Sequence, residues 1–315
     1  MKINKIKIGD IEIPNNVLLA PLAGFTDMAF RTLCLRLGAG LAFTEMVSGK
    51  GLIYGSENTE KLLLTSSEER VKALQIFGCD ADILERAVKD SRLDKFQIID
   101  LNMGCPVHKV YKNGEGSALL NDISLASKII SRLSSCGKTI TAKIRIGVKT
   151  DNFITREFVE MLEESGAKMI TVHGRTREGL YSEKVNFEQI AIAKQSAKRV
   201  LVIANGSIFS EEDADKMLEE TGADGVMLAR GALYNPFLFA RLTGKEVKED
   251  MHSFILEQIA LMQTYETDDY IVRNLRKNLN YYLKGKRGSK ILKTRILNCN
   301  DLNSLKEMLA EYFTC

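Results

Sequence analysis

The sequence has no hydrophobic run long enough to cross a membrane. Its longest candidate, residues 17–25, contains Pro21 and Gly24, whereas a spanning helix needs roughly 20 apolar residues in succession. At the start of the chain, lysines alternate with other residues and no continuous apolar segment follows, so we expect no secretory signal. These absences argue against a membrane protein and favour a cytoplasmic one.

Metal-binding and disulfide patterns are also missing. The six cysteines form no CxxC pair, and none of the three histidines stands at zinc-ligand spacing from them. We therefore expect no metal site. Cysteines this dispersed are typical of reduced thiols in the cytoplasm.

The composition indicates a large folded chain. Of 315 residues, 45% are hydrophobic and 27% are charged, which is typical of a globular protein with a substantial core and excludes disorder. The length fits two domains or one large α/β barrel with an addition. The net charge of +3 by itself identifies no partner. We expect a monomer.

Eight short apolar runs predict a barrel of parallel strands. They cover residues 17–21, 41–45, 73–77, 98–102, 140–146, 169–172, 200–204 and 225–229. Continuous apolar runs indicate strands buried on both faces, and helical patterns separate them. A Gly-Ala pair at residues 38, 166 and 222 ends a helix just before a strand, which is typical of a repeated βα unit.

Eight such units predict a (βα)8 TIM barrel. The alternative is an open, doubly wound sheet. That fold favours a GxGxxG motif after its first strand, and the sequence has none there.

After residue 243 the strand pattern stops. Amphipathic helices are predicted over residues 251–263 and 301–313, with a third helical stretch between them. We therefore divide the chain into a barrel domain, residues 1–243, and a small helical domain, residues 244–315.

The helical domain carries a run of positive charge. Residues 271–295 contain nine basic and no acidic residues, with Tyr281 and Tyr282 among them. The nine are Arg273, Arg276, Lys277, Lys284, Lys286, Arg287, Lys290, Lys293 and Arg295. Such a run is either a solvated helix face or a surface for a phosphate-rich partner such as RNA. The complete lack of acidic residues, in a chain otherwise near charge balance, favours RNA.

A barrel carries its functional site at the carboxyl ends of its strands. Lys143 lies within a buried strand, where it either points outward or meets an anionic ligand. His173 ends the sixth strand and is either a site residue or a core histidine. Cys105 follows the fourth strand and is a candidate nucleophile or general acid.

The last two strand ends predict a phosphate site. They read Asn205-Gly206-Ser207 and Ala229-Arg230-Gly231. Glycines allow the backbone to approach a ligand closely, and N–H groups in such turns cradle phosphates. An ordinary turn is the alternative, but the same pattern at both strands favours phosphate.

Taken in order, the motifs at these strand ends resemble those of the tRNA-dihydrouridine synthases, most of all the bacterial B-type subfamily. The longest matching segment runs from Leu101-Asn102-Met103-Gly104-Cys105-Pro106 into residues 112–120. Residues 19–24, 171–177 and 224–232 match as well. The similarity covers nearly the whole chain.

The resemblance implies an enzyme that uses flavin mononucleotide (FMN), with NADPH or NADH as reductant, to convert specific tRNA uridines to 5,6-dihydrouridine. It implies a hydride from flavin N5 to uracil C6 and a proton from Cys105 to C5. The family's FMN contacts correspond here to Pro21, Leu22, Ala23, Gln75, Lys143, His173, Asn205, Gly206, Ser207, Ala229 and Arg230.

The resemblance also implies contacts with the substrate. Asn102 matches the residue that binds uracil, and Arg175 and Arg177 are further candidates. The tRNA itself would contact the basic helical domain through Arg273, Arg276, Lys277, Lys284, Lys286 and Arg287.

The chain departs from the family pattern at Leu22, His108, Ser207 and Ala229. Two other functions therefore stay open. One is an FMN-dependent dehydrogenase for small dihydropyrimidine-type molecules, which has no need of the basic run. The other is a catalytically silent RNA-binding protein.

Overall fold

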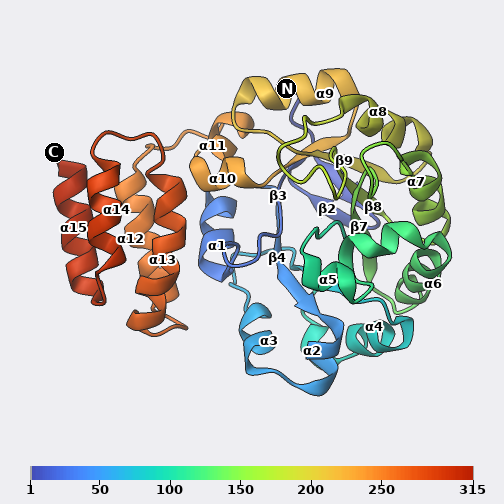
Figure 1. Ribbon diagram of the computed structural model, residues 1–315, viewed down its shortest axis with the longest axis horizontal. Coiled ribbons are helices and arrows are strands. Elements are labelled where there is room, and N and C mark those ends of the chain that lie inside the picture. The colour runs from blue at the N-terminus through green and yellow to red at the C-terminus, as the bar shows by residue number, and fades with distance from the viewer. Residues whose placement is uncertain (1, 315) are drawn as a thin grey trace.

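A closed barrel of eight parallel strands forms the body of the protein, in a computed structural model that describes residues 2–314 (Figure 1). The strands are β3 (Val17–Leu19), β4 (Leu41–Ser48), β5 (Ala73–Phe77), β6 (Ile98–Met103), β7 (Thr139–Arg145), β8 (Met169–His173), β9 (Leu201–Asn205) and β10 (Gly225–Leu228). β10 pairs with β3 and closes the barrel. All eight predicted strands are present, and the predicted TIM barrel is confirmed.

Helices surround the barrel on its outside. They are α1 (Met28–Arg36), α2 (Gly49–Tyr54), α3 (Glu57–Leu62), α4 (Ala81–Val88), α5 (His108–Lys112), α6 (Ile123–Ser134), α7 (Thr155–Glu164), α8 (Phe187–Ser196), α9 (Glu211–Thr221), α10 (Arg230–Tyr234) and α11 (Leu238–Thr243), with short 3₁₀ helices at Ser91–Leu93 and Gly116–Asn121. Asp27 caps α1 by accepting the N–H of Phe30, and Ser210 and Asp213 form a capping box on α9.

An antiparallel hairpin that the sequence did not predict precedes the barrel. β1 (Ile6–Ile8) pairs with β2 (Ile11–Ile13). The fully buried Ile8 and Ile13 pack in one cluster with residues near the starts of the barrel strands, such as Leu18. The hairpin therefore closes the amino end of the barrel. Strands of three residues are too short to produce a recognisable alternation.

Four helices follow the barrel and form a bundle beside it (Figure 1). They are α12 (Met251–Met262), α13 (Asp268–Tyr282), α14 (Ser289–Leu297) and α15 (Leu302–Thr314). The single helical stretch predicted between residues 263 and 301 is two helices. Gly285 and Gly288 separate them in left-handed conformations, with φ of +75° and +71°.

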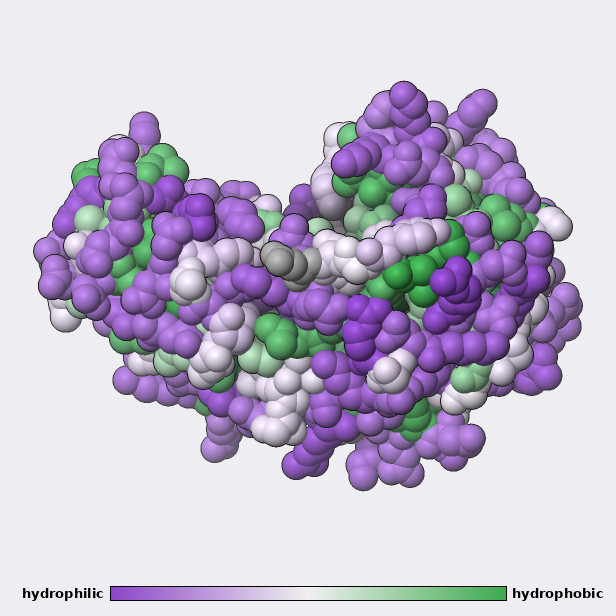
Figure 2. Space-filling view, turned by 90° about the horizontal axis from the view of Figure 1, so that it is seen from below, coloured by the Kyte–Doolittle hydropathy of each residue, from purple (hydrophilic) through white to green (hydrophobic). Residues whose placement is uncertain are grey.

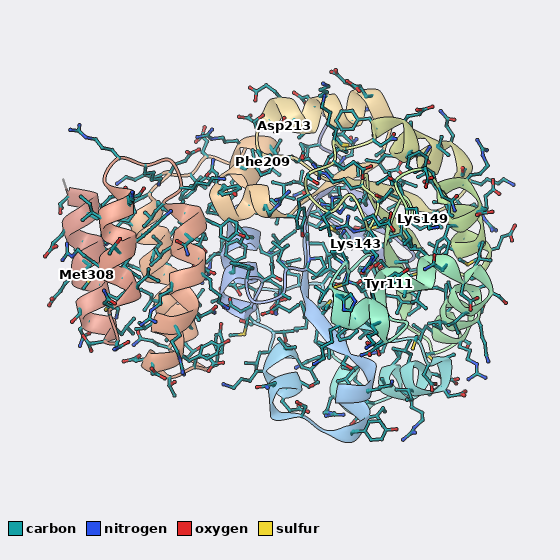
Figure 3. The ribbon with its side chains drawn as sticks, viewed as in Figure 1. Tyr111, Lys143, Lys149, Phe209, Asp213 and Met308 are labelled. Atoms are coloured by element: carbon teal, nitrogen blue, oxygen red, sulfur yellow. The ribbon has the colours of Figure 1, made fainter. Side chains whose placement is uncertain are left out.

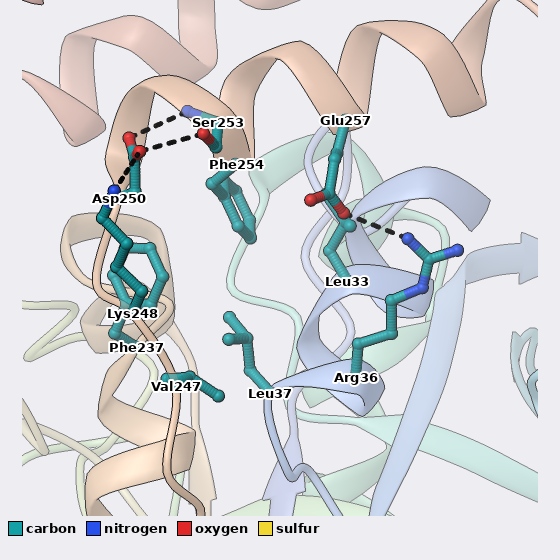
Figure 4. A pocket seen from close by; sticks show the side chains of 10 residues that line it. All are labelled: Leu33, Arg36, Leu37, Phe237, Val247, Lys248, Asp250, Ser253, Phe254 and Glu257. Atoms are coloured by element: carbon teal, nitrogen blue, oxygen red, sulfur yellow. Dashed lines mark hydrogen bonds and ion pairs between the residues drawn. The ribbon is translucent and has the colours of Figure 1, made fainter.

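The bundle packs against α1 through aromatic side chains. The ring centroid of Phe30 lies 6.2 Å from that of Phe254 and 6.5 Å from that of Tyr282. A cleft of about 390 Å³ lies beside this contact, and Arg36 and Glu257 form an ion pair there at 3.1 Å (Figure 4). In a second view the outline of the molecule is notched between the bundle and the barrel (Figure 2).

Within residues 2–314, no helix is long and apolar enough to cross a membrane. In the same part of the chain, no group of three or more His, Cys, Asp or Glu side chains is placed to hold a metal ion. The five cysteines that the structure describes are free thiols. Cys315 lies outside the described residues.

Candidate active site

A cavity of about 480 Å³ lies at the carboxyl ends of the barrel strands, and we call it the barrel cavity. Its lining includes all the residues predicted to contact FMN: Pro21, Leu22, Ala23, Gln75, Lys143, His173, Asn205, Gly206, Ser207, Ala229 and Arg230. Cys105, Asn102 and Arg175 line it as well. Lys143 extends from β7 among the barrel strands (Figure 3). A volume of this size is typical of small-molecule sites.

A line of hydrogen bonds crosses neighbouring strands at the base of the cavity. Thr141 Oγ1 and Gln75 Nε2 each donate to Asp100 at 2.7 Å. Asn102 Nδ2 donates to Gln75 Oε1 at 2.8 Å, and Asn102 Oδ1 accepts the backbone N–H of Cys105 at 2.9 Å. The strand register brings these groups together, because Asp100 lies opposite both Gln75 and Thr141.

The two ends of this line determine how its amides are oriented. An ionised carboxylate only accepts hydrogen bonds, and a backbone N–H only donates them. Gln75 must therefore turn its NH₂ group toward Asp100, and Asn102 must turn its oxygen toward Cys105. Burial raises the pKa of Asp100 to about 6, against the opposing effect of its hydrogen bonds and of Lys143. Above that pH the carboxylate is ionised and sets the direction of the line.

The backbone of Cys105 is held on both sides. Its carbonyl oxygen accepts the Ser117 hydroxyl at 2.7 Å and the Ser117 N–H at 3.2 Å. Gly116, with φ of +61°, comes so close that a Cβ added there would lie 3.0 Å from the Cβ of Cys105. Burial raises the pKa of the Cys105 thiol. The thiol is thus protonated at neutral pH and can donate a proton.

Positive charge is concentrated in the barrel cavity. Lys143, Arg145, Arg175 and Arg230 all line it, and none of its lining residues is Asp or Glu. Burial, with a contribution from Arg145, lowers the pKa of Lys143 to about 8. Burial and the four cations hold the pKa of His173 well below its usual range, so this imidazole is neutral at pH 7. Such a cavity suits an anionic ligand.

The turn at the end of β9 is a candidate anion site. Gly206 and Ser207 have consecutive positive φ values of +130° and +52°. A glycine in such a turn lets a ligand approach the backbone N–H groups closely. Arg175 Nη2 donates to Ser207 Oγ at 2.6 Å. Together with the cations, this turn fits a ligand that carries a phosphate and an electron-rich ring, as FMN does.

Gly231, which follows Arg230, is packed closely against the backbone of Ile208. A Cβ on Gly231 would lie 2.0 Å from the carbonyl oxygen of Ile208, which is impossible without displacing the backbone. The ends of β9 and β10 are thus packed directly against each other. This is the pair of turns that the sequence predicted as the phosphate site.

Some predicted substrate residues lie outside the barrel cavity. Arg177 stacks on Tyr111 instead, with its guanidinium carbon 3.7 Å from the ring centroid. In the bundle, Arg273 pairs with Asp269 at 2.6 Å, and Arg276 donates to Asn300 at 2.9 Å and to the backbone of Cys299. Lys286 lies over the ring of Phe313, and the Arg287 carbonyl accepts the hydroxyl of Tyr312. Lys277 and Lys284 face the barrel and line a neighbouring hollow.

The predicted site gave no role to several residues that line the cavity. Arg145 is noticeable in the sequence, because it lies two residues after Lys143 on the same strand, β7, and strand alternation places both on one face. Tyr181, Phe209 and Tyr281 come from two loops and from α13. No local pattern marks them, because only the tertiary fold brings these segments to the cavity.

Comparison with known proteins matches this architecture to one family. The family model "Dihydrouridine synthase (Dus)" covers residues 18–314. The chain belongs to the dihydrouridine synthase family. Because the match runs from β3 into α15, both the barrel and the four-helix bundle are part of the dihydrouridine synthase architecture.

Curated dihydrouridine synthases are similar over almost their whole length. A tRNA-dihydrouridine synthase B of Pseudomonas putida is 34% identical and covers 98% of this chain and 94% of its own. The protein of the same name from Pseudomonas aeruginosa is 33% identical over 98% of this chain and 96% of its own.

A solved structure shares the fold at low sequence identity. The 6-hydroxypseudooxynicotine amine oxidase of Pseudomonas geniculata N1 superposes with a TM-score of 0.60. It is 13% identical, over 81% of this chain and 52% of that structure's chain. At this identity the similarity concerns the barrel fold alone.

Proposed function

We propose that this protein reduces specific uridines in tRNA to 5,6-dihydrouridine. The observation that carries the proposal is the placement of Cys105, whose backbone Asn102 holds at the edge of a cation-lined cavity. Burial raises the pKa of its thiol, which suits a proton donor. The membership in the dihydrouridine synthase family and the names of the curated relatives support the same reaction.

We propose FMN as the cofactor and NADPH, or NADH, as the reductant. The turn at Gly206 and Ser207 would bind the phosphate with Arg230, and Lys143 would stand beside the electron-rich ring. When bound and reduced, the flavin supplies a hydride for C6 of uracil. Lys143 rather than neutral His173 supplies positive charge to this part of the cavity.

Cys105 completes the reduction as a general acid. Hydride addition at C6 leaves negative charge on the C5 side of the ring, and the Cys105 thiol donates the proton that forms the new C5–H bond. The resulting thiolate then regains a proton from solvent. Asn102 uses its oxygen for the Cys105 N–H and one amide N–H for Gln75. Its amide nitrogen also lies 3.8 Å from the Met46 sulfur, a weak acceptor that uracil would replace.

The division of labour follows the two parts of the chain. Residues 1–243 would hold the cofactor and the reacting base, and residues 244–315 would hold the tRNA through its phosphates. Lys284 is best placed for this, because it lies in the turn after α13, on the side that faces the barrel. We propose that the protein is a monomer and works in the cytoplasm; the free thiols of the described residues fit that compartment.

Mass spectrometry of nucleosides tests the proposal. Unmodified tRNA is incubated with the purified protein, FMN and NADPH, and uridine should gain two hydrogens. Cys105→Ala should lower the rate by about 10²–10⁴-fold while flavin stays bound. Full turnover by Cys105→Ala would refute the acid role. Equal turnover of a free pyrimidine would favour the small-molecule dehydrogenase, and tight tRNA binding without flavin would favour the silent RNA-binding protein.

A further inference from the structure

A second hollow adjoins the barrel cavity on the side of the bundle. Its lining comprises Phe25, Tyr234, Lys277, Asn280, Tyr281 and Lys284, and its volume is about 390 Å³. We call it the side hollow. Phe25 and Tyr281 line both the side hollow and the barrel cavity, so the two spaces are direct neighbours.

A row of aromatic rings runs along this boundary. The centroid of Phe25 lies 5.2 Å from that of Tyr281, which lies 5.2 Å from that of Tyr234. Tyr234 in turn lies 5.7 Å from Phe209. Three of the rings are half-buried and Phe209 is exposed. The four come from separate segments of the chain, so the row exists only where the bundle meets the barrel.

Polar groups of one helix border these rings. Lys277, Asn280, Tyr281 and Lys284 recur on one face of α13 and the turn after it, and none of the side hollow's lining residues is acidic. Lys284 Nζ lies 3.0 Å from the Tyr234 hydroxyl and 4.6 Å from its ring centroid.

The ammonium groups of Lys277 and Lys284 differ in whether acidic groups lie near them. Lys277 Nζ lies 3.3 Å from the carbonyl oxygen of Gly24 and interacts with the nearby carboxyls of Asp27 and Glu45. Lys284 has the tyrosine hydroxyl as its neighbour instead. Lys284 is therefore the cation that can meet a phosphate, whereas Lys277 holds α13 to the loop that carries Phe25.

Aromatic rings bordered by lysines form the surface on which single-stranded nucleic acids bind. Bases stack on the rings and cations meet the phosphates, and each stacked base raises the affinity by about tenfold or more. We propose that the side hollow is a subsite for a second nucleotide of the RNA, one that neighbours the uridine in the barrel cavity. Its base stacks on Tyr234 and Tyr281, and its phosphate meets Lys284.

This inference deepens the proposed function and rests on it. An enzyme that pulls one base out of a folded RNA must also hold the strand next to it, because unstacking a base is unfavourable. A neighbouring base that leaves its own stack regains a partner in the side hollow. The subsite would thus stabilise the opened strand as well as bind it.

Substitutions at Tyr234 and Lys284 test the subsite, because both line the side hollow and neither lines the barrel cavity. With the flavin-loaded enzyme and an unmodified tRNA transcript, Tyr234→Ala and Lys284→Ala should each raise KM about tenfold and leave kcat within twofold. Tyr234→Phe keeps the ring and should restore most of the affinity. The matched controls are Tyr54→Ala and Lys128→Ala, two exposed side chains on α2 and α6.

A direct readout of stacking separates this subsite from a merely structural role. A 2-aminopurine placed on either side of the modified uridine should lose fluorescence when the RNA binds the wild type, and should keep it with Tyr234→Ala. Unchanged fluorescence at both positions, or a Tyr234→Ala enzyme with the KM of the Tyr54→Ala control, would overturn the inference. If the wild type reduces no uridine, the proposed function fails instead.

Discussion

The side-chain oxygen of Asn102 accepts the backbone N–H of Cys105 at 2.9 Å, three residues further along the chain. This bond ties the proposed acid to the proposed uracil-binding residue. It also makes Cys105 the end of the line of hydrogen bonds that begins at Asp100. The position of the thiol thus depends on a carboxylate buried in the barrel.

The first prediction concerns the buried carboxylate of Asp100. Its pKa in the folded protein is about 6, above the value of about 3.9 in an unfolded chain. The folded protein binds this proton more tightly, so its unfolding free energy falls as pH rises between these two values. Relative to Asp100→Asn, the wild type should lose about 2 kcal/mol between pH 4 and pH 7.5.

Urea unfolding of both proteins at several pH values measures this difference. Subtracting the two curves removes the other titrating groups, including Asp27. A difference that does not change with pH would show that Asp100 titrates normally. At neutral pH, Asp100→Asn should also lower the rate of uridine reduction roughly tenfold or more. Gln75 and Asn102 would then lose the carboxylate that fixes the orientation of their amide groups. Thr141→Val, which removes only one neighbour of Asp100, should have a smaller effect on rate.

The second prediction concerns Lys143 and flavin binding. The pKa of its ammonium group is lowered to about 8, so the side chain is charged below that pH and neutral above it. If the charge holds an anionic cofactor, the dissociation constant of FMN should begin to rise above pH 8, by at most tenfold per pH unit.

Fluorescence titrations of FMN from pH 6.5 to 9.5 check the dependence on Lys143. Lys143→Arg keeps its charge over this range and should show no break near pH 8. Lys143→Gln should bind more weakly throughout and be equally flat. A break that survives in Lys143→Gln would assign the titration to another group.

The third prediction concerns the buried ion pair between Arg31 and Glu69, beside the loop that follows β3. Arg31 donates to both carboxylate oxygens of Glu69, at 3.0 and 3.1 Å, and to the carbonyl oxygen of Thr26 at 2.9 Å. Removing one partner leaves a buried charge unpaired, which destabilises a protein by about 3–5 kcal/mol. Glu69→Ala should lower the unfolding free energy by this amount and weaken flavin binding, because Thr26 belongs to the loop after β3.

Glu68 provides the matched control. It pairs with Arg36 at 2.7 Å, but both side chains are exposed, so Glu68→Ala should change the stability by less than about 1 kcal/mol. Thermal and urea unfolding compare the two variants directly. Equal effects of the two substitutions would contradict the distinction between a buried and an exposed pair.

The fourth prediction concerns the salt dependence of tRNA binding. Each phosphate contact that is lost should lower the slope of log affinity against log salt by about 0.7–0.9. Lys284→Ala should show this decrease, because its ammonium group faces the side hollow. Arg295→Ala should not, because Arg295 already pairs with Glu311 at 2.9 Å. Filter-binding titrations at four salt concentrations distinguish the two, and equal slopes would remove Lys284 from the phosphate contacts.

The strands of the barrel could be predicted because their signal is local. A parallel strand buried on both faces is a continuous apolar run, and the Gly-Ala joints before three of the strands mark where helices end. The hairpin at residues 6–13 carried too few residues for such a signal. The bundle was predicted as helical, but two glycines with positive φ divided its middle stretch.

The candidate site, too, has residues that the sequence predicts and residues whose placement it does not predict. Residues that directly follow a strand, such as Cys105 and Ser207, were found because a barrel collects its strand ends at one face. The basic run of residues 271–295 could be read from the sequence, but which of its side chains face the barrel could not. Arg276 and Arg295 hold the bundle together, and only Lys277 and Lys284 line the side hollow beside the barrel.

The sequence by itself determined the barrel, the helical addition and the set of strand-end residues, because periodicity and strand-end position are properties of neighbouring residues. The tertiary structure alone decided how those residues act on one another. The Asp100 line and the cluster of cations around His173 depend on strand register, and the aromatic row depends on the docking of the bundle. Contacts between segments far apart in the chain set these relationships, and no local pattern encodes them.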